Sequence, residues 1–169
     1  MGRDKALLPL GPSTLVEQIA ARVRAAAGNV TIIGPIERYR HLDIQVIEDL
    51  IPDSGPMGGL YTALKTTSAD WNLVVACDMP GLDVRFLTAM LAAAPGCGSL
   101  ALVPYSDRGW EPLCAVYHRD LISQIDRSLS HKAFKMQEFV AEIRAKPWPV
   151  SDSALLRNVN TLEDWQVHT

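Results

Sequence analysis

The sequence predicts one α/β domain over residues 1–169, with a mostly parallel, doubly wound sheet as the middle of three layers. Apolar runs typical of strands alternate with amphipathic segments typical of helices through roughly the first hundred residues. These runs are apolar at successive positions, as expected of strands that helices cover on both faces. The length suits a single domain, and no linker, repeat or low-complexity stretch divides the chain.

The first half of the chain predicts a helix near its start, followed by alternating strands and helices. Ser13 or Thr14 can cap the first helix, and Glu17 completes a capping box with Thr14. Gly28 is expected to end this helix. The elements expected next are a strand over 29–34, a helical turn over 36–42, an apolar run over 43–49, a Gly/Pro-rich loop over 51–59, a helix over 60–67, and a strand that begins at 71 and stops at Asp78.

The second half predicts further strands and helices in a different order. The expected elements are a helix over 83–94, strands over 99–105 and 112–118 joined by a polar turn, helices over 119–129 and 132–143, an extended segment over 144–150, and a short final helix capped by Thr161. Because crossovers between parallel strands are right-handed, the strands are expected to form one largely parallel sheet.

Composition excludes several classes of protein. A formal net charge of -3 without a basic block argues against nucleic-acid binding. No apolar stretch approaches the ~20 residues of a membrane span, and no secretory signal opens the chain. Three cysteines without a CxxC pair predict reduced thiols in a cytoplasmic protein, not a disulfide framework or a zinc site.

Asp78 is the first candidate functional residue, because ligands of open α/β sheets bind beyond the carboxyl ends of the strands. A carboxylate at this position can hold Mg²⁺, which prefers one or two protein oxygens together with water and phosphates. The same residue can equally cap backbone amides in an Asp-x-Pro turn. Position alone leaves both interpretations open.

Two further segments carry candidate residues. The stretch "VIEDLIPDSGPMGGL" places Asp49 at a strand end, and its glycines can let a ligand approach the backbone closely. Tight structural turns explain those glycines equally well. Near the start, Lys5 offers a mobile charge and Arg3 a bidentate fork for phosphate, although basic residues there are usually only solvated.

Five motifs in order resemble the molybdenum cofactor guanylyltransferase family. They are "MGRDKALLPLG", "VIEDLIPDSGPMGGLYTAL", "CDMPGL", "EPLCAVY" and "NVNTLED", which together span nearly the whole chain. The resemblance implies a Rossmann-like nucleotidyltransferase fold. It also implies transfer of GMP from Mg-GTP to molybdopterin carrying molybdenum, with release of pyrophosphate. The implied partners are GTP, molybdopterin or its molybdenum form, and the molybdoenzymes or chaperones that receive the product.

The resemblance also implies roles for individual residues. Lys5 corresponds to a nucleotide-binding lysine and Asp78 to the aspartate that holds Mg²⁺. The residues that correspond to the guanine and nucleotide pocket are Asp49, Gly55 and Gly59, and those that correspond to the pterin side of the cleft are Asn158 and Asn160.

The opening departs from the family pattern, because members begin with a strand and a glycine-rich loop before the Gly-x-Asp-Lys stretch. Here "MGRDK" comes first, so residues 1–169 alone are expected to be poorly stable and to bind GTP weakly. Two alternatives stay open at this stage. One is a cytidylyltransferase or another related nucleotidyltransferase, and the other is a non-catalytic protein that binds molybdopterin.

Overall fold

The computed structural model describes residues 5–7, 9–10 and 13–159. Local signals in the sequence define its first long helix, α1 (Leu15–Ala27), as expected. The Glu17 carboxylate accepts hydrogen bonds from the Thr14 N–H at 2.8 Å and from the Thr14 hydroxyl at 2.6 Å. Gly28 ends the helix with φ of 83°, a conformation that glycine adopts without steric cost.

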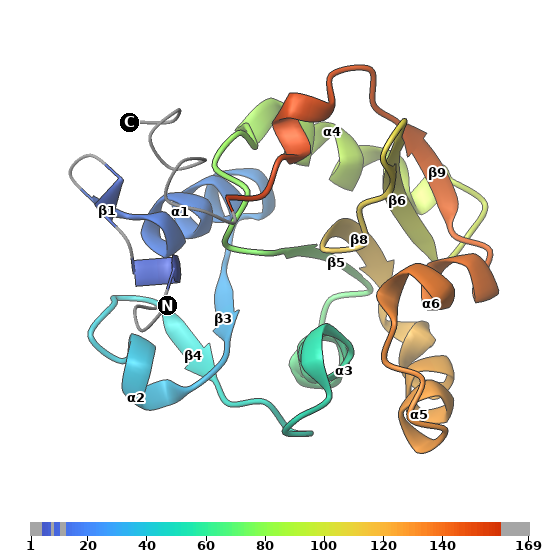
Figure 1. The fold of residues 1–169 in the computed structure, drawn as a ribbon, viewed down its shortest axis with the longest axis horizontal. Coiled ribbons are helices and arrows are strands. Elements are labelled where there is room, and N and C mark those ends of the chain that lie inside the picture. The colour runs from blue at the N-terminus through green and yellow to red at the C-terminus, as the bar shows by residue number, and fades with distance from the viewer. Residues whose placement is uncertain (1–4, 8, 11–12, 160–169) are drawn as a thin grey trace.

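Helices and strands then alternate along the chain (Figure 1). The strands are β1 (Pro9–Leu10), β2 (Ser13–Thr14), β3 (Thr31–Ile33), β4 (Gln45–Ile47), β5 (Trp71–Val75), β6 (Ala101–Ser106), β7 (Gly109–Trp110), β8 (Cys114–His118) and β9 (Lys146–Pro149). The other α-helices are α2 (Ile36–Tyr39), α3 (Gly55–Thr66), α4 (Val84–Ala93), α5 (Ile122–Ser130) and α6 (Met136–Glu142). Short 3-10 helices are η1 (Lys5–Leu7), η2 (Ala94–Gly96), η3 (Arg119–Leu121) and η4 (Ser153–Leu156). Within the described part of the chain, no helix has the length and apolar character needed to cross a membrane.

The strand directions correct the expectation of a mostly parallel sheet. In the larger sheet β8 lies between β5 and β6 and runs antiparallel to both, and β7 is antiparallel to β6. Parallel pairing occurs between β6 and β9 and, in a separate two-stranded sheet, between β3 and β4. The segment that joins β6 to β8 spans only 107–113, too short for the crossover that parallel neighbours require.

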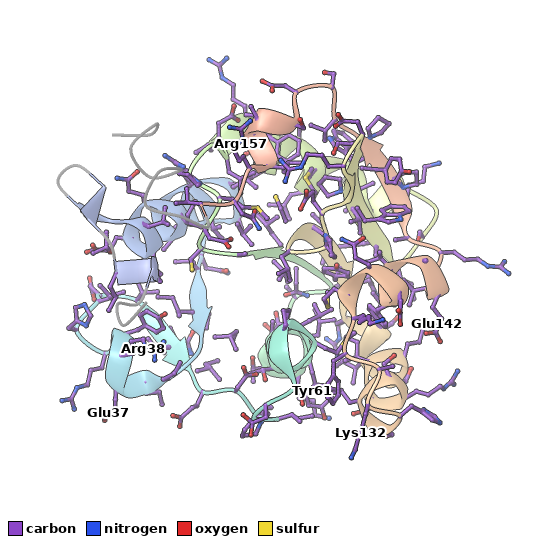
Figure 2. The ribbon with its side chains drawn as sticks, in the orientation of Figure 1. Glu37, Arg38, Tyr61, Lys132, Glu142 and Arg157 are labelled. Atoms are coloured by element: carbon purple, nitrogen blue, oxygen red, sulfur yellow. The ribbon has the colours of Figure 1, made fainter. Side chains whose placement is uncertain are left out.

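Helices cover both faces of the larger sheet, which forms the middle of three layers (Figure 1). Alternate residues of β8 face opposite layers, as in any strand. Ala115 and Tyr117 pack with α3, α5 and α6, whereas Cys114 and Val116 pack against the side that carries α4. Charged side chains such as Lys132 and Glu142 point away from this core (Figure 2).

Two helices begin at other residues than the sequence predicts. Helix α3 starts at Gly55 instead of near residue 60, because Pro56 suits the first turn and the close packing around Gly58 continues the helix. Helix α6 starts at Met136 and not at 132, since the chain first turns at Lys132, whose φ is 55°. The final helix predicted at Thr161 lies outside the described residues.

Candidate active site at the carboxyl end of β5

Asp78 lies three residues beyond β5 and lines a cavity of about 460 Å³ that we call the strand-end cavity. Around Asp78 its lining includes Ala6 from η1, Pro56 and Gly59 from α3, and Cys77. The Asp78 side chain is half-buried, and its Oδ1 atom is shielded from solvent. Residues from three separate parts of the sequence therefore meet where the sequence predicts a ligand site.

A second cavity of about 430 Å³ lies beside the first and is here called the Phe134 cavity. Pro56 and Leu113 line both cavities, which makes them neighbours. The Phe134 cavity is also lined by Met79, Glu111, Pro112, Lys135, Met136, Gln137, Glu138 and Asn158. The first turn of α3 and the segment after Asp78 thus separate two adjoining hollows of similar size.

Antiparallel pairing brings a second carboxylate, Glu111, towards Asp78. The Ala76 N–H donates a 2.7 Å hydrogen bond to the carbonyl oxygen of Leu113, so the chain entering β8 lies beside the end of β5. Burial raises the pKa of the Glu111 carboxyl above its usual value, and the nearby Asp78 charge adds to this shift. Arg108, whose Nη2 lies 3.7 Å from Glu111 Oε1, partly opposes it.

Asn158 also reaches this region, through a backbone bond that ties its segment to Asp78. The Val159 N–H donates a 2.8 Å hydrogen bond to the Asp78 carbonyl oxygen. Within the described residues, the buried Oδ1 atom of Asn158 has no hydrogen-bond partner, which is costly for a polar atom that binds nothing. Asn160 lies outside the described residues, so only one of the two predicted asparagines is placed.

The glycine-rich loop contributes both structural and open positions. Asp49 Oδ1 lies 3.0 Å from the Thr62 hydroxyl, which ties the end of β4 to α3. At Gly58 an added Cβ would lie 2.8 Å from the Ile51 carbonyl oxygen, so glycine is required there by packing. Gly59 has no atom within 4 Å of such a Cβ and lines the strand-end cavity, whereas Gly55 has a φ of 56°. Gly59 and Asp78 therefore line the same cavity, while Asp49 bonds within the fold to Thr62.

Lys5 belongs to η1, directly before Ala6, which is buried and lines the strand-end cavity. Ala6 packs with Val16 and Tyr39, so η1 is anchored against α1 and α2. The backbone of Lys5, next to Ala6, is therefore held close to this cavity. Arg3 lies outside the described residues.

The donor set around Asp78 fits a magnesium ion that shares its coordination with a substrate. Asp78, Glu111 and Asn158 offer only oxygen donors, the type that Mg²⁺ prefers. Among the described residues no group of three or more His, Cys, Asp or Glu side chains could hold a metal ion. An ion at Asp78 would consequently need oxygens from phosphate and water to complete its shell.

Sequence reasoning did not single out Glu111 within its motif, and it treated Gly58 only as one of the loop glycines that could let a ligand approach the backbone. Glu111 opens the "EPLCAVY" motif, and the short connection between β6 and β8 is the signal that could have placed it near Asp78. For Gly58, the signal was the Gly- and Pro-rich stretch from Gly55 to Gly59 at the start of a helix. In both cases the neighbour that matters, Asp78 for Glu111 and Ile51 for Gly58, is brought close by tertiary packing.

The MobA-like NTP transferase domain profile matches residues 1–146 of the chain. The chain belongs to this family. A Synechococcus elongatus protein described as a probable molybdenum cofactor guanylyltransferase is 33% identical over 175 residues, covering 98% of this chain and 90% of that protein. A molybdenum cofactor guanylyltransferase of Syntrophotalea carbinolica is 28% identical over 98% of this chain and 83% of its own length. This MobA-like chain is therefore a nucleotidyltransferase of molybdenum cofactor biosynthesis.

Solved structures share the fold of the MobA-like chain. Molybdopterin-guanine dinucleotide biosynthesis protein A from Archaeoglobus fulgidus superposes with a TM-score of 0.83 over 99% of this chain and 89% of that one, at 20% identity. A 2-C-methyl-D-erythritol 4-phosphate cytidylyltransferase from Thermus thermophilus gives a TM-score of 0.74 over 97% and 91%, at 18% identity. The nucleotidyltransferase α/β fold predicted from the sequence is confirmed, apart from the strand directions.

Proposed function

We propose that this chain transfers GMP from Mg-GTP to the terminal phosphate of molybdopterin carrying molybdenum. The products would be pyrophosphate and the molybdopterin guanine dinucleotide cofactor. The observation that carries this proposal is that Asp78 lines the strand-end cavity while Met79, the next residue, lines the adjoining Phe134 cavity. Two adjoining cavities that meet at one short segment suit a reaction that joins two large substrates.

The donor nucleotide is assigned to the strand-end cavity. The first turn of α3 lies at this cavity through Pro56 and Gly59, and the amino end of a helix favours phosphate. Lys5, next to Ala6 in the lining of this cavity, would neutralise phosphate charge as a point cation. Gly59, which lines the same cavity as Asp78, is assigned to the nucleotide, and Asp49 and Gly55 keep the role in the guanine and nucleotide pocket that the family resemblance implies.

The pterin acceptor is assigned to the Phe134 cavity. Phe134, Met79 and Met136 provide apolar surface for a flat ring system, and the Oδ1 atom of Asn158 is a free acceptor for a ring N–H. Asn160 follows one residue after Val159 and is assigned to the same substrate. Because Val159 bonds to Asp78, acceptor binding at Asn158 would set the acceptor phosphate close to the donor.

The chemistry requires positioning and charge neutralisation more than a protein nucleophile. A phosphate oxygen of the acceptor attacks the α-phosphorus of GTP, and the bond from that phosphorus to the bridging oxygen of pyrophosphate breaks. The attacking oxygen is already anionic, so no general base is needed. Mg²⁺ bound at Asp78, with Glu111 adjacent, would supply neutralisation of phosphate charge. Lys5 and the α3 terminus orient the triphosphate.

A base-selectivity assay tests the proposal. The full chain is incubated with molybdenum-loaded molybdopterin, Mg²⁺ and either GTP, CTP or ATP, while pyrophosphate and the dinucleotide product are measured. The expected result is product with GTP and not with CTP or ATP, together with GTP binding in equilibrium titrations that is weak for residues 1–169. Product with CTP instead would favour the cytidylyltransferase alternative, and molybdopterin binding without any transfer would favour the binding-protein alternative.

A further inference from the structure

One short segment, residues 78–82, is shared by the two cavities of the candidate site, and we call it the junction segment. Asp78 lines the strand-end cavity, whereas Met79 lines the Phe134 cavity. Met79 and Leu82 are almost completely buried, which anchors the segment in the core. A displacement of the junction segment would therefore change both cavities at once.

Helix α1 holds the junction segment through Arg22. The Nη1 atom of Arg22 donates a 2.7 Å hydrogen bond to the carbonyl oxygen of Pro80. Because Pro80 is buried, its carbonyl oxygen requires a donor, and a charged donor forms a stronger bond than a neutral one. The second hydrogen bond of the guanidinium is longer, 3.4 Å to Oε1 of Gln18 on the same helix. Among the described residues, Arg22 thus uses its charge outside α1 on the junction segment.

The same helix forms a wall of the strand-end cavity. Ile19 and Val23 of α1 line this cavity, and Arg22 directly precedes Val23. The bond from Arg22 to Pro80 therefore joins the wall of the proposed nucleotide cavity to the segment that begins with Asp78.

A second element, the short helix η4, packs against the junction segment at Gly81. A Cβ atom added to Gly81 would lie 3.0 Å from the carbonyl oxygen of Ala154 and 3.2 Å from that of Leu155. Both oxygens belong to the backbone of η4, which cannot rotate away as the end of a flexible side chain can. Glycine at this position lets the two backbones approach each other closely.

The position of η4 determines where Asn158 lies. Asn158 comes two residues after the end of η4, and Leu156 of η4 packs in the same core cluster as Met79. The Val159 N–H then donates its 2.8 Å hydrogen bond to the Asp78 carbonyl oxygen. A displacement of η4 would consequently move Asn158 relative to the junction segment.

We infer that Arg22 and Gly81 are positioning residues for the transfer reaction. Arg22 holds the junction segment to the wall of the nucleotide cavity, and Gly81 seats η4 and the proposed acceptor-binding Asn158 against it. Neither Arg22 nor Gly81 lines either cavity, so each acts through the junction segment. The inference rests on the proposed function, because a misplacement of about 1 Å between reacting groups can lower a rate about 10²-fold.

Separate variants test the two contacts. Arg22→Met removes the donor to the buried Pro80 carbonyl oxygen, whereas Arg22→Lys retains a donor and should restore most of the lost rate. Gly81→Ala places a Cβ atom against the backbone of η4. Its matched control is Gly96→Ala, because a Cβ atom at Gly96 would have no neighbour within 4 Å.

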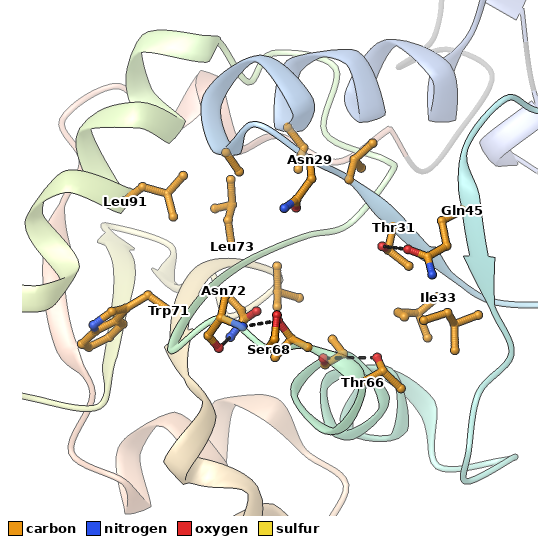
Figure 3. Close-up of a pocket in the computed structure, with 18 of the residues that line it drawn as sticks. Asn29, Thr31, Ile33, Gln45, Thr66, Ser68, Trp71, Asn72, Leu73 and Leu91 are labelled. Carbon is orange, nitrogen blue, oxygen red and sulfur yellow. Dashed lines mark hydrogen bonds between the residues drawn. The ribbon is translucent and has the colours of Figure 1, made fainter.

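Asn72→Ala is the matched control for Arg22→Met. Asn72 lies near the start of β5, at the opposite end of the strand from the junction segment, and lines a further cavity of about 550 Å³ (Figure 3). Its Nδ2 atom donates a 3.1 Å hydrogen bond to the carbonyl oxygen of Ala69. Asn72→Ala therefore also removes a bond from a side chain to a backbone carbonyl, but at a distance from both substrates.

Steady-state kinetics with GTP and molybdenum-loaded molybdopterin measure kcat and KM, and amide hydrogen exchange follows the Val159 N–H. Arg22→Met and Gly81→Ala should lower kcat about 10- to 100-fold and keep the KM for GTP within about threefold of the parent value. The Val159 N–H should exchange at least about tenfold faster in both variants. Both controls should keep the kcat and the Val159 exchange rate of the parent.

Parental kcat together with parental Val159 exchange in Arg22→Met and Gly81→Ala would overturn the inference. An equal loss of kcat in Asn72→Ala would also overturn it, because the loss would then follow from general destabilisation. Failure of the proposed function looks different, since the unmodified chain would then transfer no GMP. In that case Val159 exchange still decides, and a parental rate in both variants would overturn the inference.

Discussion

The backbone N–H of Val159 donates a 2.8 Å hydrogen bond to the carbonyl oxygen of Asp78, although the two residues lie far apart in the sequence. This bond connects the segment that carries Asn158 to the carboxylate at the end of β5. Asn158 lines the Phe134 cavity and Asp78 lines the strand-end cavity, so the bond spans the boundary between the two. The proposed acceptor and donor sites therefore share one rigid connection.

Replacing Asp78 by asparagine should abolish most transfer and leave the fold intact. The amide keeps the shape of the side chain but removes the charge that Mg²⁺ requires, and we expect a loss of about 10²- to 10³-fold in rate. Pyrophosphate release measures the rate, and circular dichroism measures the melting temperature. Asp43→Asn, at an exposed position away from both cavities, is the matched control. Unchanged turnover with the same Mg²⁺ dependence would refute the assignment.

Lys5→Ala should weaken nucleotide binding without lowering the melting temperature. A charge-assisted hydrogen bond contributes ~1.5–3 kcal/mol, which corresponds to about 10- to 150-fold in affinity. Isothermal titration with GTP measures the change. Lys65→Ala, at an exposed lysine in the last turn of α3, should bind GTP normally. GTP affinity that is equal in both variants would remove Lys5 from the site.

Replacing both Asn158 and Asn160 by alanine should weaken molybdopterin binding and leave GTP binding nearly unchanged. Two neutral hydrogen bonds account for about 5- to 150-fold in affinity. The competing explanation is that these amides only shape the turn, which predicts a lower melting temperature and no selective loss. Asn29→Ala, at an exposed asparagine before β3, is the control. A selective loss of GTP binding would assign the pair to the nucleotide.

Gly58 and Gly59 form a matched pair for separating packing from ligand access. Gly58→Ala should destabilise the protein by ~1–3 kcal/mol, because its Cβ would lie 2.8 Å from the Ile51 carbonyl oxygen. Gly59→Ala meets open space and should be neutral or stabilising by up to about 1 kcal/mol, as alanine favours the helix. Denaturant titration measures both. In nucleotide titrations Gly59→Ala should still weaken GTP binding, and normal binding would exclude Gly59 from the pocket.

Glu111 gives a pH-dependent prediction. Its folded-state pKa is raised, mainly by burial, so the ionised carboxylate costs stability at pH values above that pKa. The cost is absent below the unfolded-state pKa of about 4.5 and develops as the pH rises through the folded-state value. Glu111→Gln should therefore melt at a higher temperature than the parent at pH 7, with the difference vanishing near pH 4. Glu142→Gln, at an exposed position, should show no such trend. A difference in melting temperature between Glu111→Gln and the parent that stays constant from pH 4 to pH 7 would contradict the prediction.

Elements that depend on near neighbours could be predicted from the sequence. Thr14 and Glu17 form their capping box, and Asp83 caps α4 by accepting the Phe86 N–H at 2.7 Å. The apolar run that ends before Asp78 forms β5 and directs Asp78 to the strand end. These features depend only on residues a few positions apart. The sequence shows both the residue types that form the local hydrogen bonds and the spacing of the apolar residues.

Only the tertiary structure decided three features. They are the direction of the strands, the start of α3 and the approach of Glu111 to Asp78. Each depends on residues that are distant in the chain: β8 must choose its direction against β5, and Gly58 must pack against Ile51. The half-burial of β5 is of the same kind, since it depends on which other elements pack around that strand. Apolar composition marks a strand for burial, but which partners cover it is a property of the assembled sheet.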